Sequence, residues 1–217
     1  MSRLEKIDRL NDKARQRTTK RSKRKEELAD FAIDALKQLG YARTSLRDIA
    51  EHSGVSVGML HYYFEDKVDL ISFCVRRYKA TFIDEMDKVI LGSTELGSLA
   101  ENFADSLSRA IRDDAETHRL WYDIRTQALF EDSFQDVVSE IEAGLIELVE
   151  RLLDKINLPK DVARSVYLNL DGSFRYYLQR HIFGDATAVE TFRQSVLGQL
   201  RGTIERSMSQ SGAKTDG

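Results

Sequence analysis

A chain of 217 residues that has a single proline, Pro159, can form long helices almost without interruption. Proline lacks a backbone donor and breaks helix interiors, so its near-absence favours an all-α fold over a loop-rich β-sandwich. Apolar residues recur at three- and four-residue steps along most of the chain, which is the spacing of one helix face. About nine helices are expected, near residues 20–39, 46–52, 57–63, 67–90, 99–113, 117–128, 133–156, 160–183 and 186–206.

Charge divides the chain into two parts that the net charge of −3 conceals. Residues 1–80 carry 18 Lys and Arg against 12 Asp and Glu, whereas residues 81–217 carry 15 against 24. The first 25 residues alone hold 11 basic and three acidic side chains. This asymmetry is expected when one part of a protein faces a polyanion. The alternative is a solvated, disordered basic arm that has no partner.

The residue content argues against several classes of protein. A lone cysteine, Cys74, excludes an intrachain disulfide and a cysteine-based metal cluster. No apolar run reaches the roughly 18 residues of a membrane span, and the charged amino end lacks the apolar core of a signal peptide. We therefore expect a cytoplasmic protein with no membrane partner. No Gly-rich phosphate loop, His-x-x-x-His pair or nucleophile elbow is present, so we expect neither an enzyme nor a metal or other cofactor.

The most informative segment is residues 40–70, GYARTSLRDIAEHSGVSVGMLHYYFEDKVDL. Two short expected helices are separated here by a three- to four-residue turn with a glycine, the pattern of a helix-turn-helix. Gly54 permits the left-handed backbone that such a turn needs, and Ser56 is placed to cap the second helix. Gly58 lets the start of that helix approach a phosphate closely. The alternative is a tight helical corner packed inside an all-α protein.

This segment closely resembles the DNA-binding signature of the tetracycline-repressor (TetR) family. The matching residues are Thr44, Ile49-Ala50, Gly54-Val55-Ser56, Gly58, Leu60, Tyr62-Tyr63-Phe64, Lys67 and Leu70. One departure is His61, at a place where the family often has tyrosine. The run from 61 to 64 is also somewhat similar to that of the choline-responsive betaine-pathway regulators in the same family. The resemblance covers roughly residues 22–75.

The resemblance implies an N-terminal three-helix bundle that contains the helix-turn-helix, followed by a C-terminal helical domain that binds a ligand and forms dimers. The expected parts are a basic flexible arm (1–21), a DNA-binding domain (22–75), a regulatory and dimerisation domain (76–206) and a disordered tail (207–217). The protein would then be a homodimer that represses transcription from a palindromic operator in double-stranded DNA until a small-molecule effector releases it. The alternative is a helical interaction module whose basic arm binds nucleic acid without specificity.

Eight residues of the segment are expected to contact DNA. Phosphate contacts, which set the register, are assigned to Thr44, Ser56, Tyr63 and Lys67. Base-edge contacts are assigned to Val57, Gly58, His61 and Tyr62. Further backbone contacts are possible for Arg43 and Arg47, and the basic residues between 15 and 25 would strengthen binding without choosing a sequence.

Two other sets of residues are assigned in the acidic part of the chain. Aromatic walls and a polar anchor suit a ligand cavity formed by Phe103, Leu107, Trp121, Arg125, Phe174 and Tyr177. An apolar seam on the last two helices suits a dimer interface at Leu170, Phe192, Val196 and Leu200. For both sets the alternative is an ordinary core within one chain. The charge of the ligand stays open, because Arg125 favours an anion whereas the net charge of this part favours a cation.

Overall fold

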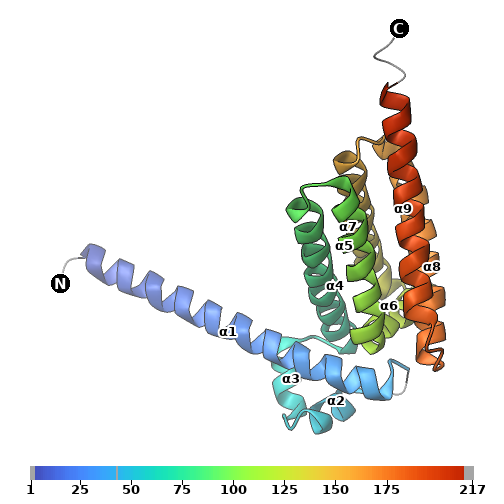
Figure 1. Ribbon diagram of the computed structural model, residues 1–217. Coiled ribbons are helices and arrows are strands. Elements are labelled where there is room, and N and C mark those ends of the chain that lie inside the picture. The colour runs from blue at the N-terminus through green and yellow to red at the C-terminus, as the bar shows by residue number, and fades with distance from the viewer. Residues whose placement is uncertain (1–2, 43, 213–217) are drawn as a thin grey trace. The chain divides into compact units, whose positions relative to one another are not determined.

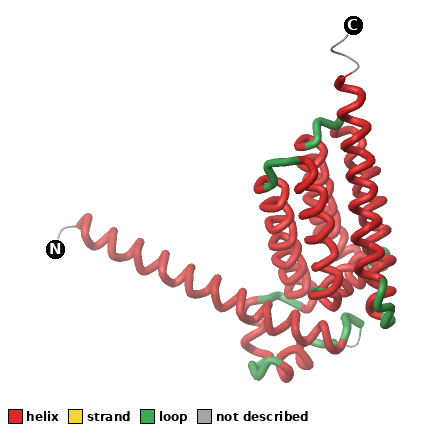
Figure 2. Tube along the Cα trace, viewed as in Figure 1, coloured by secondary structure: helices red, strands yellow, loops and turns green. Residues whose placement is uncertain are grey.

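The computed structural model describes residues 3–42 and 44–212, with side chains described for residues 18–42 and 44–205. Arg43, a candidate for a backbone contact with DNA, lies outside the described residues. The described residues form nine α-helices and two short 3-10 helices and contain no strand (Figures 1 and 2), so the predicted all-α fold is confirmed. Across the part that was searched, no helix has the length and apolar character that crossing a membrane requires.

The chain divides into two compact units, Met1–Val75 and Arg76–Gly217, and the fourth helix contributes residues to both. The helices are α1 (Arg3–Leu39), α2 (Leu46–His52), α3 (Val57–Tyr63), α4 (Lys67–Gly92), α5 (Leu96–Asp113), α6 (Ala115–Gln127), α7 (Gln135–Lys155), α8 (Ala163–Ile182) and α9 (Ala188–Gly212). The two 3-10 helices are η1 (Asp132–Phe134) and η2 (Lys160–Val162), and η2 directly follows Pro159.

The first and last helices extend beyond their predicted ends. α1 begins at Arg3, and α9 continues to Gly212. These helix ends overlap the flexible arm predicted for 1–21 and the disordered tail predicted for 207–217, and both parts stay predictions. α1 contains no proline or glycine and is rich in strong helix formers, so backbone propensity extends it beyond its packed residues. Once an end is packed, each added residue of a helix gains one hydrogen bond.

In the first unit, three helices and the start of α4 enclose a small core. Alanines of α1 and α2 let the helices approach closely, while leucine and phenylalanine side chains of α3 and α4 fill the centre. The core residues are Leu28, Ala29, Ala32, Ala35, Ile49, Ala50, Leu60, Phe64, Leu70 and Cys74. The helix-turn-helix therefore rests on an apolar base that α1 and α4 supply.

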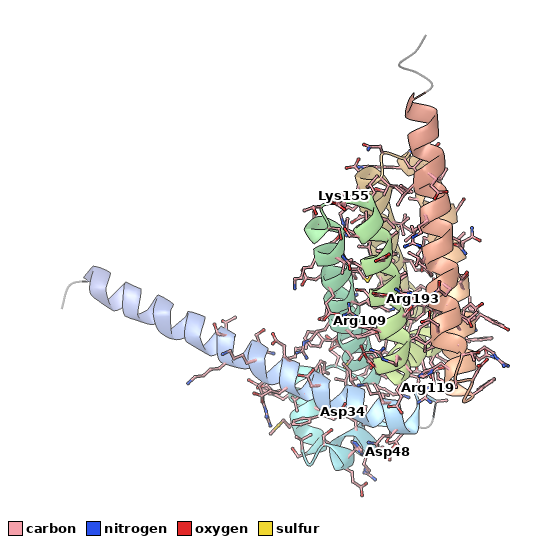
Figure 3. The ribbon with its side chains drawn as sticks, viewed as in Figure 1. Asp34, Asp48, Arg109, Arg119, Lys155 and Arg193 are labelled. Carbon is pink, nitrogen blue, oxygen red and sulfur yellow. The ribbon has the colours of Figure 1, made fainter. Side chains whose placement is uncertain are left out.

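In the second unit, α5 lies along α9, and α8 packs against α5, α6, α7 and α9 (Figure 1). Trp121, Phe134 and Phe192 are among the largest side chains buried there. Ion pairs join neighbouring helices at the surface, and one of them runs from Arg193 of α9 (Figure 3) to Asp105 of α5. Exposed pairs of this kind contribute at most about 1 kcal/mol each, so the buried apolar contacts hold the bundle together.

Candidate functional site

Local hydrogen bonds build the turn between α2 and α3. At the start of α2, the Ser45 N–H donates to the Asp48 carboxylate (Figure 3) at 2.7 Å, and the Asp48 N–H donates to Ser45 Oγ at 3.2 Å. The hydroxyl and N–H of Ser45 lower the pKa of Asp48 by donating to its carboxylate. Gly54 has φ +64°, the left-handed conformation that the sequence predicts for this turn. Ser56 Oγ then accepts from the Met59 N–H at 3.1 Å and caps α3.

α3 buries one face and presents the other to solvent. Leu60 is buried in the core of the first unit. The Tyr62 side chain is 67% exposed, and its ring meets that of Tyr63 edge to face at 4.9 Å between centroids. The exposed residues among those assigned to DNA are Ser56, Gly58, His61 and Tyr62, and the half-buried ones are Val57, Tyr63 and Lys67. The face that carries most of the predicted base-reading residues is therefore open.

Basic side chains of α1 lie beside this open face. The Arg21 guanidinium carbon is 5.6 Å from the centroid of the Tyr62 ring. Arg24 lies next to α3 as well, since its Nη2 donates to the sulfur of Met59 at 3.4 Å. Part of the predicted basic arm is thus a helix that supplies positive charge along the edge of α3.

Two of the predicted phosphate-contacting residues hold the loop that precedes α2. Thr44 is 2% exposed, and its hydroxyl donates to the Gly40 carbonyl at 2.5 Å. Because its buried hydroxyl is directed at its own chain, contact of the Thr44 side chain with a phosphate stays a prediction. Lys67 Nζ donates to the Tyr41 carbonyl at 2.8 Å and lies 4.0 Å from the centroid of the Tyr41 ring. Contact of Lys67 with a phosphate stays a prediction.

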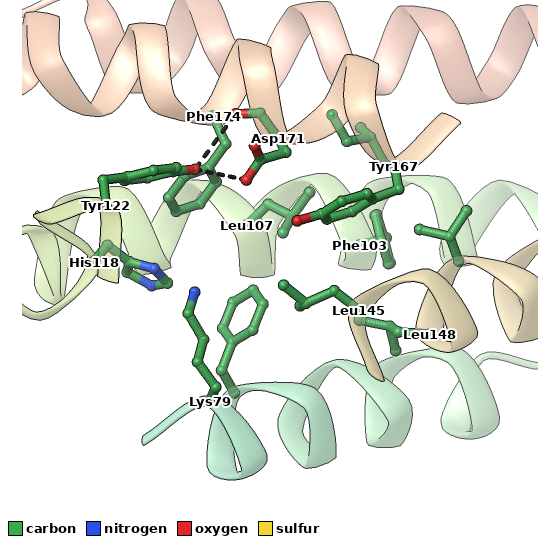
Figure 4. Close-up of a pocket in the computed structure, with 13 residues that line it drawn as sticks. Lys79, Phe103, Leu107, His118, Tyr122, Leu145, Leu148, Tyr167, Asp171 and Phe174 are labelled. Carbon is green, nitrogen blue, oxygen red and sulfur yellow. Dashed lines mark hydrogen bonds between the residues drawn. The ribbon is translucent and has the colours of Figure 1, made fainter. Parts of the chain in front are cut away.

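The second unit contains a cavity of about 60 Å³ (Figure 4). Residues of α4, α5, α6, α7 and α8 line it. Three of the six residues assigned to a ligand, Phe103, Leu107 and Phe174, are in its wall. Trp121 and Tyr177 do not line it, and Tyr177 instead packs 5.8 Å from Phe192 between ring centroids.

Arg125, the predicted polar anchor, is held by two carboxylates. Its Nη1 donates to Asp171 at 2.7 Å, and its Nη2 pairs with Glu142 at 2.7 Å. The Tyr122 hydroxyl donates to the other oxygen of Asp171 at 3.0 Å, and burial raises the pKa of Tyr122 well above its usual value. Arg125 already pairs with both carboxylates and does not line this cavity, so its role as an anion anchor stays a prediction.

The polar residues that do line the cavity include Lys79, which sequence reasoning missed. Lys79 is 4% exposed, and the described residues offer its ammonium group no hydrogen bond or ion pair. Burial lowers its pKa to about 7, although the charge of Asp171 acts in the opposite direction. The position of Lys79 in the sequence would have indicated its burial. It lies four residues after Val75 and three before Phe82, on the apolar stripe of α4.

His118 is the second missed residue in the wall of the cavity. It is 1% exposed, and within the described structure its Nδ1 has no hydrogen-bond partner. Burial is the main reason that its pKa lies well below the usual value, and the nearby charge of Lys79 adds to the effect. The Tyr167 hydroxyl, also in the wall, has no described partner either. His118 lies three residues before Trp121 on the buried face of α6, a position that would have indicated its burial.

The role of the predicted seam in a dimer stays a prediction, although three of its four residues are buried in their own chain. Phe192, Val196 and Leu200 are buried against their own chain, and Leu170 is half-buried at the cavity. The three buried residues lie on α9, the helix that packs on α5 and α8 of the same chain. The large apolar side chains that stay exposed on α8 or just after it include Leu168, Tyr176 and Phe183.

Comparison with known proteins gives consistent results. Residues 28–72 match the family described as bacterial regulatory proteins, tetR family. The fatty acid metabolism regulator protein of Bacillus subtilis is 25% identical over 179 residues, which cover 82% of this chain and 80% of that protein. The nicotine-responsive transcriptional repressor HdnoR of Paenarthrobacter nicotinovorans is 23% identical over 163 residues, 71% of this chain and 84% of that protein.

A solved structure shares the fold of both units. The crystal structure of a TetR transcription regulator from Haloarcula marismortui superimposes with a TM-score of 0.69 at 22% identity. The superposition covers 83% of this chain and 98% of that one. The betaine-regulator subgroup stays a prediction. Together with the match at residues 28–72 and the geometry of α2 and α3, these findings show that the chain is a DNA-binding transcriptional regulator of the TetR family.

Proposed function

We propose that this regulator represses transcription as a homodimer on a palindromic operator in double-stranded DNA, and that a small-molecule effector releases it. The main support is the open face of α3, where Gly58, His61 and Tyr62 are exposed beside Arg21 and Arg24 of α1. A recognition helix that enters the major groove needs such a face, with donors, acceptors and apolar groups for base edges and positive charge for the flanking phosphates. This role requires no catalytic chemistry.

Operator binding can be tested without knowing the target gene. Duplexes selected from a randomised library by the full chain should converge on an inverted repeat, and a gel shift at fixed salt should favour that repeat over scrambled DNA by at least about 10³-fold. The two half-sites should lie about one helical turn, ~34–36 Å, or more apart. Binding that ignores sequence and disappears at modest salt would instead support the alternative of a non-specific basic arm.

Gly58 provides a sharper prediction, because its own chain gives no reason for a glycine. A Cβ built at Gly58 meets no other atom within 4 Å, and its φ is not positive. Glycine in a helix costs about 0.5–1 kcal/mol relative to alanine, so Gly58→Ala is expected to keep or slightly raise the thermal stability. If a phosphate or base lies against this backbone, the same variant should lose about tenfold or more in operator affinity.

The matched control for that variant is Gly97→Ala. Gly97 is exposed in the first turn of α5, in the second unit, and a Cβ there also meets no atom within 4 Å. This change should leave DNA binding intact. An unchanged operator affinity for Gly58→Ala would show that α3 does not approach DNA through Gly58.

The proposed dimer interface moves from the predicted seam to the exposed side of α8. Leu168 and Tyr176 lie eight residues apart on this helix, and Phe183 follows its end. Apolar side chains grouped in this way on a monomer are typical of a protein–protein contact. A two-fold axis through the contact would bring the two copies of α8 together.

Leu168→Glu is therefore expected to weaken the dimer at least about tenfold, because it buries a carboxylate in each half of a self-complementary contact. Analytical ultracentrifugation across a concentration series measures this effect. The control is Leu91→Glu, at an exposed leucine in the last turn of α4 rather than on α8. A mass that stays dimeric in Leu168→Glu would place the interface elsewhere.

We infer that release by an effector runs through α4. Residues 67–75 of this helix belong to the first unit, and its Lys79 and Phe82 line the cavity of the second. An effector that prefers a dimer with misplaced recognition helices would weaken operator binding by the coupling free energy, typically about 1–3 kcal/mol. The nicotine-responsive relative gives independent support for a repressor of this kind.

A further inference from the structure

The cavity of the second unit contains a buried ammonium group, that of Lys79, to which the described residues offer no hydrogen bond or ion pair. In Figure 4, Lys79 extends from α4 with its Nζ directed into the space between His118 and the aromatic wall. Asp171 is a carboxylate of the same wall, but its two oxygens already accept from Tyr122 and Arg125.

The ring centroids of Tyr78, Phe82 and Trp121 lie 5.3, 5.2 and 5.0 Å from Lys79 Nζ. Such cation–π contacts attract the ammonium group but supply no opposite charge, and burial lowers its pKa to about 7. A ligand that supplies a negative charge would offset this effect of burial.

A second polar group is available close to the ammonium. His118 Nδ1 has no partner in the described structure, and three rings hold the imidazole in place. The centroids of Tyr78 and Phe82 lie 5.2 Å from that of His118, and Phe174 lies at 4.8 Å. Because the ring is fixed, its N–H or lone pair is already oriented for a ligand. Such buried and unsatisfied groups are rare in folded proteins and call for a partner.

The remaining wall determines the rest of the ligand. Phe103, Leu107, Leu145 and Leu148 form an apolar surface opposite the polar groups (Figure 4). A dry engineered cavity of about 150 Å³ holds one benzene molecule, so the 60 Å³ here admits about the volume of a carboxylate head group. Longer bodies require neighbouring side chains to move.

We propose that the cavity takes an apolar monocarboxylic acid, whose carboxylate pairs with Lys79 and meets His118 while its short hydrocarbon body packs on Phe103, Leu107 and Leu145. A primary amine would place a second cation beside Lys79, where the Asp171 carboxylate of the wall is already paired. An alcohol would leave the charge uncompensated. The proposal deepens the proposed function and rests on it only for the link to DNA release.

The protein contains its own reporter for this test. Trp121 is the only tryptophan of the chain, and Lys79 Nζ lies 5.0 Å from its ring centroid. Trp121 fluorescence is titrated at pH 6.5 with straight-chain acids from acetate to octanoate, each paired with the primary alcohol and amine of equal length. At that pH a lysine with a pKa near 7 is mostly protonated. Acids should bind saturably and at least about tenfold more tightly than the alcohols, and the amines should not bind.

This comparison of acids, alcohols and amines uses the unaltered protein, so its result does not depend on whether a variant folds. An alcohol or amine that binds as tightly as the acid of equal length would overturn the proposal. Binding of no acid in the series would overturn it as well.

The variant Lys79→Met tests whether the ammonium group of Lys79 binds the acid. Methionine keeps the length and removes the charge, so acid affinity should fall at least about tenfold while the melting temperature rises. Lys88→Met is the control on the same helix, since Lys88 is exposed and pairs only with Asp84 on the surface. It should leave acid binding unchanged. Retained acid binding in Lys79→Met would overturn the assignment of Lys79.

A gel shift on the selected operator separates this proposal from the proposed function. One outcome is an acid that binds, as detected by Trp121 fluorescence, without changing the affinity for the operator. That result supports the proposed ligand class and contradicts release of the operator by this effector. Sequence-specific DNA binding without any acid binding supports the regulator and overturns the ligand class.

Discussion

Tyr62→Ala is expected to lower the affinity for the selected operator about 10- to 100-fold per recognition helix and to leave non-specific DNA binding nearly unchanged. A base contact in the major groove is worth about 1–3 kcal/mol of discrimination, and the Tyr62 ring is the largest exposed group on α3. Because its side chain is 67% exposed, its removal should cost the fold little beyond the contact with Arg21, about 0.5–1 kcal/mol. Gel shifts at one fixed salt concentration measure both affinities.

The matched control for this variant is Phe130→Ala. Phe130 is 80% exposed after α6 in the second unit, so it removes a similar area from a surface that has no proposed DNA contact. Its operator affinity should equal that of the unaltered protein. An equal loss on operator and non-specific DNA in Tyr62→Ala would remove Tyr62 from the base-reading residues and assign it to general attraction.

Phe192→Ala is expected to lower the free energy of unfolding by about 3–5 kcal/mol. Phe192 is completely buried, with ring centroids of Phe174 and Tyr177 at 5.7 and 5.8 Å, so alanine leaves a cavity between α8 and α9. Denaturant unfolding at several protein concentrations measures the loss, since dimerisation adds a concentration-dependent term to stability. The loss should be the same at every concentration.

Phe183→Ala is the comparison that distinguishes core from interface. Phe183 is 70% exposed, so its removal should change the stability of a single chain by less than about 0.5 kcal/mol. A loss in Phe192→Ala that vanishes at low protein concentration would return Phe192 to the dimer interface, where the sequence alone had placed it.

The helix-turn-helix could be predicted almost residue by residue because its determinants are local. The left-handed turn at Gly54, the cap at Ser56 and the apolar contact of Leu60 lie at fixed offsets within a few residues. Neighbouring residues along the chain fix such a motif before any distant packing is known. Thr44 is the exception, because its burial depends on how residues 40–45 fold back toward α1.

The second unit was less predictable because its site is assembled from distant segments. Periodicity identifies an apolar face but does not tell whether that face meets its own chain or a partner. The sequence therefore assigns Phe192 to a dimer seam, although the residue is buried in its own chain. The same reasoning treats charged residues as surface residues, which is why Lys79 and Asp171 were missed. Both occupy core positions of their helices, and Asp171 is tolerated there because Arg125 and Tyr122 reach it from α6.

The continuity of α4 has a consequence for how a regulator of this kind can diversify. Lys79 at the cavity lies five residues after Cys74, which belongs to the core of the first unit. This spacing is about 7.5 Å along one helix. Cavity residues on α5, α7 and α8 can change without altering that stretch, and so can the exposed residues of α3. New effectors and new operators are therefore accessible by independent substitutions, whereas residues 74–79 must satisfy both units at once.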